Sequence, residues 1–242
     1  MVTAVRSLSH KRRLSTYTEK VLSYEPFTYW PLKEVAGTTA RCLVNPAYNA
    51  TYSGVTLDNT IGPDGENNVP LFDGVNDVIA LPVVALDVPF DGSLGTMMIW
   101  ARVFNVGVWT DSTQRCAFGL GSGGANEIQL ARPTTANQFR GDYEAGSVIE
   151  SMAVSSLSDT DWMHWCLTWS AAADAVFLYK DGVQVGTSTT LGVWALALST
   201  GRSAIGDFRS TAPARPWSGW LAHAAIWNTV LTPTQVLDLS SV

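Results

Sequence analysis

The sequence predicts an all-β protein built as a two-sheet antiparallel sandwich. From Phe27 onward, short apolar runs are separated by Gly, Asp, Asn and Pro, a pattern typical of strands joined by turns. Within these runs apolar or aromatic side chains recur at every second position, which is the period of a strand with one buried face. Because 242 residues lie within the range of a single β-sandwich, we expect one such domain.

The alternation is clearest over residues 97–104 and 162–169, where odd- and even-numbered side chains form two distinct faces. The same pattern predicts strands over Val69–Phe72, Val78–Leu81, Ala117–Leu120, Glu127–Ala131, Gln138–Tyr143, Val148–Val154, Ala175–Lys180, Ser203–Gly206 and Trp217–Trp227. Asp181 and Gly182 stand between two β-rich runs and predict a hairpin, because both central residues of a type I′ turn need positive φ.

One short helix is predicted at the C-terminal end. Thr232 is suited to the N-cap, Pro233 to the first helical position, and Gln235 completes a capping-box pattern. The apolar side chains expected to pack onto the sandwich are Val236, Leu237 and Leu239.

Residues 1–25 predict a basic N-terminal arm, separate from a domain over residues 26–242. The first 20 residues hold five basic side chains and one acidic side chain, a net charge of +4, whereas the rest of the chain carries −10. The body should therefore repel nucleic acid and anionic membranes, and we expect no membrane partner and no sequence-specific nucleic-acid partner. Two interpretations of the arm stay open: a solvated terminus, or an anchor that acts through Lys11, Arg12 and Arg13.

The cysteines and the N-terminus predict where the protein is made. Cys42, Cys116 and Cys166 form no CxxC motif, and their odd number does not suit a disulfide framework. Cys166 lies in a strand-like run and is expected to be a buried free thiol. Since no apolar segment follows the basic residues and no run of about 20 apolar residues occurs, we expect a soluble protein made in a cytoplasm without a signal peptide.

Five motifs follow one another along the chain: Tyr29-Trp30-Pro31-Leu32, Phe72-Asp73-Gly74-Val75-Asn76-Asp77, Trp162-Met163-His164-Trp165, Leu178-Tyr179-Lys180-Asp181-Gly182 and Trp217-Ser218-Gly219-Trp220-Leu221. This order resembles the laminin-G-like jelly rolls of the concanavalin A-like lectin/glucanase superfamily, over roughly residues 27–240. The resemblance implies a jelly-roll sandwich, and its particular form is similar to modules of bacteriophage virion proteins. The motifs themselves are explained by turns and packing, since a fold signature need not mark a site.

Enzymatic chemistry is not predicted. A glucan hydrolase on such a fold would need two carboxylates about 5–5.5 Å apart with a supporting acid on one strand face. Asp142 and Glu144 share a face, but we expect them to lack a third acidic partner. His10, His164 and His223 are accompanied by no nucleophile elbow, and the last two are expected to be structural. We therefore expect no enzyme.

No cofactor is expected, and calcium stays an alternative because relatives of this fold carry the ion near a sheet rim. Calcium takes six to eight oxygen ligands, usually with two or more carboxylates. The candidate carboxylates are Asp58, Asp64, Glu66, Asp73 and Asp77. Their spacing resembles no local calcium loop, so these ligands would have to converge from separate loops.

A sugar site would combine an exposed aromatic ring with planar polar groups. Trp109 lies in a loop and is the predicted platform, with Arg140, Tyr143 and Glu144 as the polar side. An exposed Trp109 could instead contact a neighbouring subunit, because aromatic side chains are enriched at protein interfaces. The sequence leaves both interpretations open.

The predicted function is that of a non-enzymatic virion structural protein, a decoration, fibre or tail component of a phage. In this hypothesis the arm binds capsid or tail proteins or a sister subunit, within a homo-oligomer, and the jelly roll presents its loops outward. The protein would be made in the host cytoplasm and end in the virion. The alternative is a carbohydrate-binding adhesin module that recognises a host surface glycan.

Overall fold

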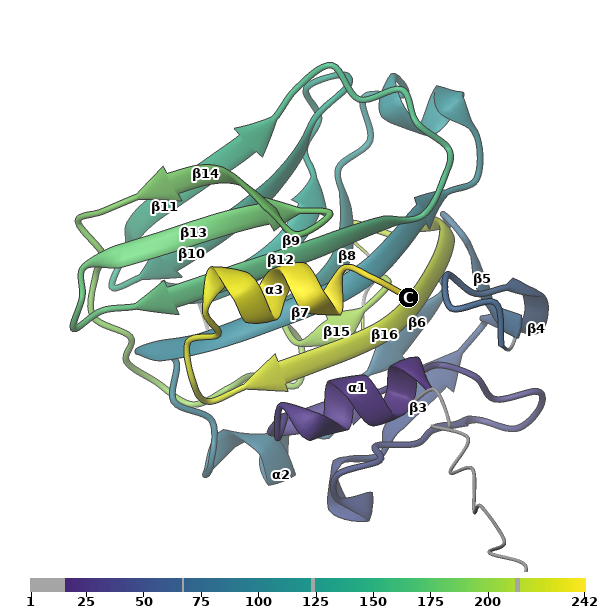
Figure 1. Cartoon of the computed structure of the whole chain (residues 1–242), viewed down its shortest axis with the longest axis horizontal. Helices are drawn as coiled ribbons and strands as arrows, with labels where there is room; N and C mark the ends of the chain where they lie inside the picture. Colours follow the sequence, from purple (N-terminus) through teal and green to yellow (C-terminus); the bar gives the residue numbers. More distant parts are fainter. Residues whose placement is uncertain (1–15, 67, 123–124, 212–213) are drawn as a thin grey trace, which may run out of the picture.

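The computed structural model describes residues 16–66, 68–122, 125–211 and 214–242. Two antiparallel sheets of eight strands each lie face to face, with few helices (Figure 1). This confirms the predicted all-β jelly-roll sandwich. The strands predicted from alternation are all present, with ends that differ by a few residues.

The first sheet has the order β14-β13-β12-β7-β16-β5-β4, and β1 pairs with β16. Its strands are β1 (Thr28–Trp30), β4 (Thr56–Ile61), β5 (Asn68–Asp73), β7 (Leu94–Val103), β12 (Met163–Ser170), β13 (Ala175–Lys180), β14 (Val183–Ser188) and β16 (Ser218–Trp227). The second sheet has the order β11-β10-β9-β8-β15-β6-β3-β2. Its strands are β2 (Thr39–Ala40), β3 (Ala50–Ser53), β6 (Val78–Ala80), β8 (Arg115–Gly121), β9 (Glu127–Arg132), β10 (Phe139–Ala145), β11 (Val148–Val154) and β15 (Ala204–Ile205).

The main core fills the space between the two sheets. On β7, Met97 and Ile99 belong to this core, whereas Met98 and Trp100 belong to a second cluster on the other face of the first sheet. The strict alternation follows from the pleat of the strand, which sends successive side chains to opposite faces. Large rings fill the main core, and its fully buried tryptophans are Trp30, Trp109, Trp165, Trp169 and Trp217.

The hairpin and the C-terminal helix form where they were predicted. Asp181 has φ 50° and Gly182 has φ 78°, and they join β13 to β14. Helix α3 (Pro233–Leu239) begins with a capping box between Thr232 and Gln235. Val236 and Leu239 are buried as predicted, whereas Leu237 is only half-buried, with 53% of its surface exposed. It lies at the edge of the packed face, beside Gly182 in the turn between β13 and β14.

Residues 16–25 differ from the predicted arm, because most of them form helix α1 (Tyr17–Ser23) on the outer face of the first sheet. Thr16 and Glu19 form a capping box, and Tyr17 and Val21 are buried one turn apart. This local signal was present in the sequence and was missed, as was the short helix α2 (Val83–Asp87). The basic residues Lys11, Arg12 and Arg13 lie outside the described residues.

Helix α1 is fastened to α3, and Figure 1 shows the two helices over the same sheet. The Tyr17 hydroxyl donates to the Leu239 carbonyl at 2.7 Å and accepts from Trp100 Nε1 at 2.8 Å. The Lys20 ammonium donates to the Asp238 carbonyl at 3.1 Å, and the Tyr24 hydroxyl donates to the Asp238 carboxylate at 2.7 Å. The Tyr17 bond satisfies the Leu239 carbonyl, one of the last carbonyls of α3, which have no partner further along the helix.

The cysteines are buried and unpaired, which confirms the predicted free thiol at Cys166. Burial raises the pKa of the Cys166 thiol, so the group stays protonated. None of the helices in the described ranges has the length and apolar character that crossing a bilayer requires.

We expect Tyr17→Phe to lower the free energy of unfolding by about 1–3 kcal/mol, because it leaves Trp100 Nε1 and the Leu239 carbonyl buried without this partner. Tyr24→Phe is the matched control at the end of the same helix. Its bond to Asp238 is partly exposed, and we expect a loss below about 1 kcal/mol. Urea unfolding of the two variants measures the difference. Equal losses would contradict a buried role for α1.

Candidate functional site

A polar trough lies on the outer face of the second sheet, across β9, β10 and β11. Side chains of β9 and β10 that face inward, such as Ile128 and Tyr143, belong to the main core. Because the strands alternate, the neighbouring positions face outward, and most of them are polar. The trough has a volume of about 230 Å³. Its lining consists of Glu127, Gln129, Arg140, Asp142, Glu144, Ile149, Ser151 and Arg215.

Asp142 is the centre of the trough. The register places Gln129 of β9 and Ser151 of β11 directly opposite it on either side. Gln129 Nε2 donates to one carboxylate oxygen at 2.6 Å, and Ser151 Oγ donates to the other at 2.7 Å. Arg140 adds an ion pair, with its Nε 2.8 Å from Asp142 Oδ2. The carboxylate is 4% exposed, and these contacts compensate for its burial.

Arg215 forms the other side of the trough and reaches it over Phe208. A Cβ atom at Gly119 of β8 would lie 2.7 Å from the Phe208 ring, so glycine is needed for this ring to cover the strand. The Arg215 guanidinium lies 4.6 Å from the centroid of the ring. Its Nη1 donates to Glu127 Oε1 at 2.6 Å and to Gln129 Oε1 at 2.8 Å. Stacking and hydrogen bonding together fix the direction of the guanidinium.

The loop that carries Arg215 is organised by Asp207, which is fully buried. Its carboxylate accepts the backbone N–H groups of Arg209 at 2.9 Å, Ala214 at 3.1 Å and Arg215 at 3.1 Å. The Arg215 carbonyl in turn accepts the N–H group of Cys116 on β8 at 2.7 Å. The Asp207 carboxylate therefore organises the loop internally, and the bond from Cys116 attaches the backbone of Arg215 to β8.

Glu144 differs from the other two trough carboxyls, Glu127 and Asp142, which are each paired with an arginine. It stands opposite Glu127 in the pairing of β10 with β9. Burial raises the pKa of Glu144, the charges of Glu127 and Asp142 raise it further, and Arg202 and Arg215 oppose this rise. The group therefore has hydrogen-bonding capacity to offer a ligand.

The expectation that Asp142 and Glu144 lack a third acid is wrong. Glu127 supplies it from the neighbouring strand, which a search along a single strand does not detect. Two of the three carboxylates are nevertheless held by cations, Glu127 by Arg215 and Asp142 by Arg140. This leaves one uncommitted carboxyl, whereas glycoside hydrolysis uses a working pair.

The four predicted sugar-binding residues separate into two groups. Arg140 and Glu144 lie together in the trough. Trp109 is fully buried and its Nε1 donates to the Asp159 carbonyl at 2.8 Å, so its prediction as an exposed platform is wrong. The short helix η2 (Val106–Trp109) turns this ring into the core. Tyr143 is also buried, on the opposite face of β10 from the trough, and donates to the Gly92 carbonyl at 3.0 Å.

Sequence reasoning missed the trough as a unit. The outward positions of β9 and β11 were available from the alternation, yet Gln129 and Ser151 were not singled out. Arg215 gave no local signal, because it reaches β9 from a loop more than 80 residues later in the chain.

The loop carboxylates considered for calcium are occupied by the chain itself. Asp64 pairs with Lys33 and with His223 Nε2, the latter at 3.3 Å. Asp73 accepts the Val75 N–H at 2.8 Å, and Asp77 accepts the Asp73 N–H at 2.8 Å. Over residues 16–66, 68–122, 125–211 and 214–242, no three His, Cys, Asp or Glu side chains are placed to hold a metal ion.

The two histidines of the domain are buried. Burial lowers the pKa of His164 to about 3, and its Nε2 lies 3.4 Å from Met98 Sδ. His223 Nδ1 lies 2.7 Å from the Tyr29 hydroxyl. Neither ring lines the trough, so neither can serve a ligand there.

A larger groove of about 470 Å³ lies beside α1 and is lined by loop residues that include Val35, Arg41 and Leu43. Its Glu34 already accepts from the Tyr52 hydroxyl at 2.7 Å and from the Arg41 N–H at 2.9 Å. We favour the smaller trough as the site because seven of its eight lining residues stand on paired strands, which position side chains more accurately than loops do.

We expect Glu144→Gln to raise the free energy of unfolding at pH 7, by no more than about 0.5 kcal/mol because the side chain is partly exposed. The folded protein raises the pKa of this carboxyl, so its charged form is disfavoured relative to the unfolded chain. The gain should disappear below about pH 4, where the carboxyl is protonated in both states. Thermal unfolding across pH measures it, with Glu25→Gln as a control outside the trough. A loss of stability at pH 7 would contradict the assignment.

Comparison with known families gives one match over most of the domain. A family model described as the concanavalin A-like lectin/glucanases superfamily matches residues 73–237, which is more than half of the chain and includes every trough residue. The chain is also 29% identical over 91 residues to the neuronal pentraxin receptor of Mus musculus, covering 36% of this chain and 18% of that protein. It is 29% identical over 90 residues to neuronal pentraxin-1 of Homo sapiens, covering 35% of this chain and 21% of that protein. The chain thus spans about a fifth of the length of these curated relatives.

Solved structures are similar in fold. The botulinum neurotoxin serotype D binding domain matches with a TM-score of 0.63 and 13% identity, over 89% of this chain and 51% of that one. Trypanosoma rangeli sialidase in complex with sialic acid matches with a TM-score of 0.64 and 15% identity, over 88% of this chain and 32% of that one. Domain 4 of AbnA is part of an extracellular arabinanase from Geobacillus stearothermophilus and was solved in complex with arabinotriose. It matches with a TM-score of 0.55 and 19% identity, over 79% of this chain and 81% of that one. At these identities the likeness is one of fold alone.

Proposed function

Because the chain belongs to the concanavalin A-like lectin/glucanases superfamily, we propose that it is a lectin-like module that binds a carbohydrate in the polar trough without cleaving it. The observation that carries this proposal is the row of planar polar groups on three adjacent strands, with Asp142 between Gln129 and Ser151. Amide, carboxylate and guanidinium groups match the paired hydroxyls of a sugar ring through bidentate hydrogen bonds.

The trough is organised before any ligand arrives. Arg140 and Arg215 are each held by a carboxylate, so little side-chain entropy is lost when their remaining N–H groups bind a ligand. Glu144 offers an acceptor on the same face. Sugar hydroxyls both donate and accept, and they suit a site that presents cationic donors beside a carboxyl.

The structural neighbours support a carbohydrate ligand by analogy of fold. The Trypanosoma rangeli sialidase was solved with sialic acid and the AbnA domain with arabinotriose. Binding without cleavage is supported by the pairing of Glu127 and Asp142 with arginines, which leaves Glu144 without a free carboxylate partner.

We expect Arg140→Ala and Glu144→Ala each to weaken binding of the recognised glycan at least about tenfold, because each removes a charged hydrogen-bonding group worth about 1.5–3 kcal/mol. A glycan array identifies the ligand, and calorimetric titration gives the dissociation constants. Gln184→Ala, at an exposed position of β14 in the first sheet, is the control and should bind normally. Unchanged affinity in both trough variants would contradict the proposal.

Cleavage is tested in the same assay. No reducing ends should be released from the bound glycan by the unmodified chain. If the unmodified chain releases reducing ends and Glu144→Gln does not, the protein is a hydrolase and the proposal of binding without cleavage is wrong.

As a second candidate we propose a virion structural protein of a phage, for which the carbohydrate site would serve host contact. This setting is supported by the contrast of +4 on the first 20 residues with −10 on the rest, and by the resemblance of the motifs to virion modules. The basic segment would bind capsid or tail proteins, and the sandwich would face outward within a homo-oligomer.

The joint substitution of Lys11, Arg12 and Arg13 by Ala should lower co-sedimentation of the full chain with phage particles at least about tenfold, since it removes three of the five positive charges in the first 20 residues. Raising the salt concentration should produce a similar loss in the unmodified chain. Unchanged co-sedimentation would show that these residues are not the anchor.

A further inference from the structure

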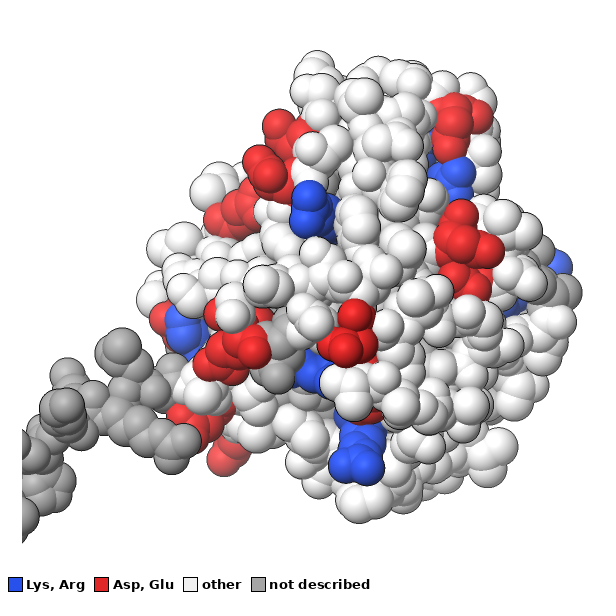
Figure 2. All heavy atoms as spheres, turned by 90° about the vertical axis from the view of Figure 1, so that its right-hand side faces the viewer, with Lys and Arg blue, Asp and Glu red and all other residues white. Residues whose placement is uncertain are grey.

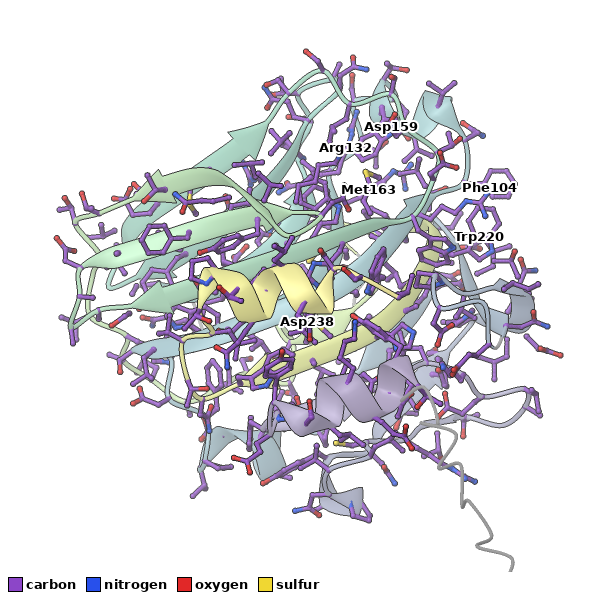
Figure 3. The ribbon with its side chains drawn as sticks, viewed as in Figure 1. Phe104, Arg132, Asp159, Met163, Trp220 and Asp238 are labelled. Atoms are coloured by element: carbon purple, nitrogen blue, oxygen red, sulfur yellow. The ribbon has the colours of Figure 1, made fainter. Side chains whose placement is uncertain are left out.

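An aromatic surface occurs on the first sheet, on the opposite side of the sandwich from the polar trough. We define it as Phe104, Trp220, Arg102 and Asn59. Trp220 of β16 stands opposite Arg102 of β7 and opposite Leu71 of β5, so the row crosses three paired strands. Figure 3 labels Phe104 and Trp220 side by side at the right-hand end of the molecule.

The two rings are stacked, and we call the pair the aromatic plate. Their centroids are 5.7 Å apart, and their planes differ by 25°. Phe104 is 53% exposed, although burial of a phenylalanine side chain favours folding. Its backbone N–H donates to the Ser218 carbonyl at 3.0 Å, which holds the residue beside β16. An exposed ring on a fixed backbone adds little to the stability of the fold, and exposed apolar surface of this kind is typical of a binding site.

Planar polar groups surround this plate. The Arg102 guanidinium lies 4.8 Å from the centroid of Trp220, and its Nε donates to the Thr160 carbonyl at 2.8 Å. Trp220 Nε1 donates to Asn59 Oδ1 at 2.8 Å. These bonds use Arg102 Nε and Asn59 Oδ1, and they fix the orientation of the guanidinium and of the amide. The Asn59 Nδ2 and Arg102 Nη donors remain for hydrogen bonds at the edge of the plate.

The chemistry of the surface selects a small neutral occupant. Figure 2 looks onto this end of the molecule and shows a largely uncharged surface, on which a few acidic and basic side chains lie close to one another. Arg102 is the one formal charge of the defined surface. Two rings supply at most a few hundred Å² of apolar area. A stable protein interface needs about 800 Å² on each partner.

We propose that the aromatic surface is a second carbohydrate-binding site, specific for a neutral pyranose. The C–H face of the sugar stacks on the exposed Phe104 ring, and its hydroxyls accept hydrogen bonds from Asn59 Nδ2 and the Arg102 guanidinium. The site goes beyond the proposed function, because it lies on the other sheet and uses none of the trough residues. Two sites on opposite faces would let one molecule bind a polymeric glycan with avidity or bridge two chains.

Affinity electrophoresis of the full chain through gels that contain a β-glucan, a mannan or a galactan tests the site. At least one of these neutral polysaccharides should retard the unmodified chain. Phe104→Ala should raise the dissociation constant at least about tenfold, and Asn59→Ala should raise it to a smaller extent. Val106→Ala, which truncates a neighbouring side chain that is 55% exposed, is the matched control and should change nothing.

Arg140→Ala separates this site from the trough, since it should leave retardation by the neutral polysaccharide unchanged. If Arg140→Ala abolishes retardation and Phe104→Ala does not, the trough is the only sugar site and the aromatic surface is not one. Absence of retardation by all three polysaccharides overturns the proposal. A change of oligomeric state in Phe104→Ala without a change in sugar binding also overturns it, in favour of a protein partner. Near-UV circular dichroism verifies that each variant is folded.

Discussion

The period-two alternation of β10 is the constraint on which both the core and the polar trough depend. One face of this strand sends Phe139 and Tyr143 into the core, and the other sends Arg140, Asp142 and Glu144 into the trough. A shift of register by one residue would bury the charges and expose the rings. The free energy gained by burying the aromatic face therefore also sets the position of every polar group on the outer face.

Charge pairing allows the trough to keep five ionisable groups on a half-buried surface. Asp142 and Glu127 would each pay a desolvation cost if they were isolated. Arg140 and Arg215 offset this cost, and Phe208 supports Arg215 from below by stacking. The same pairs remove the freedom of the long side chains, which makes the trough rigid. Rigidity of this kind lowers the side-chain entropy that is lost when a ligand binds.

Local signals predicted the strands, the Asp181–Gly182 hairpin and the capping box at Thr232, because each depends on neighbouring residues in the chain. The burial of Trp109 was not predictable in this way, since a loop tryptophan is exposed or buried according to how the loop packs. The pairing of Glu127 with Glu144 required the register between two strands, and Arg215 required a tertiary contact across more than 80 residues. Helix α1 is a different case: its capping box was visible, and the basic charge of the segment obscured it.

The most direct test of the trough is a crystal structure of the chain with its preferred oligosaccharide. The account predicts that the sugar lies across β9, β10 and β11, with hydroxyl oxygens about 2.7–3.2 Å from the nitrogens of Arg140 or Arg215 and from the carboxyl of Glu144. A sugar bound on the loops beside α1, with the trough side chains untouched, would contradict it.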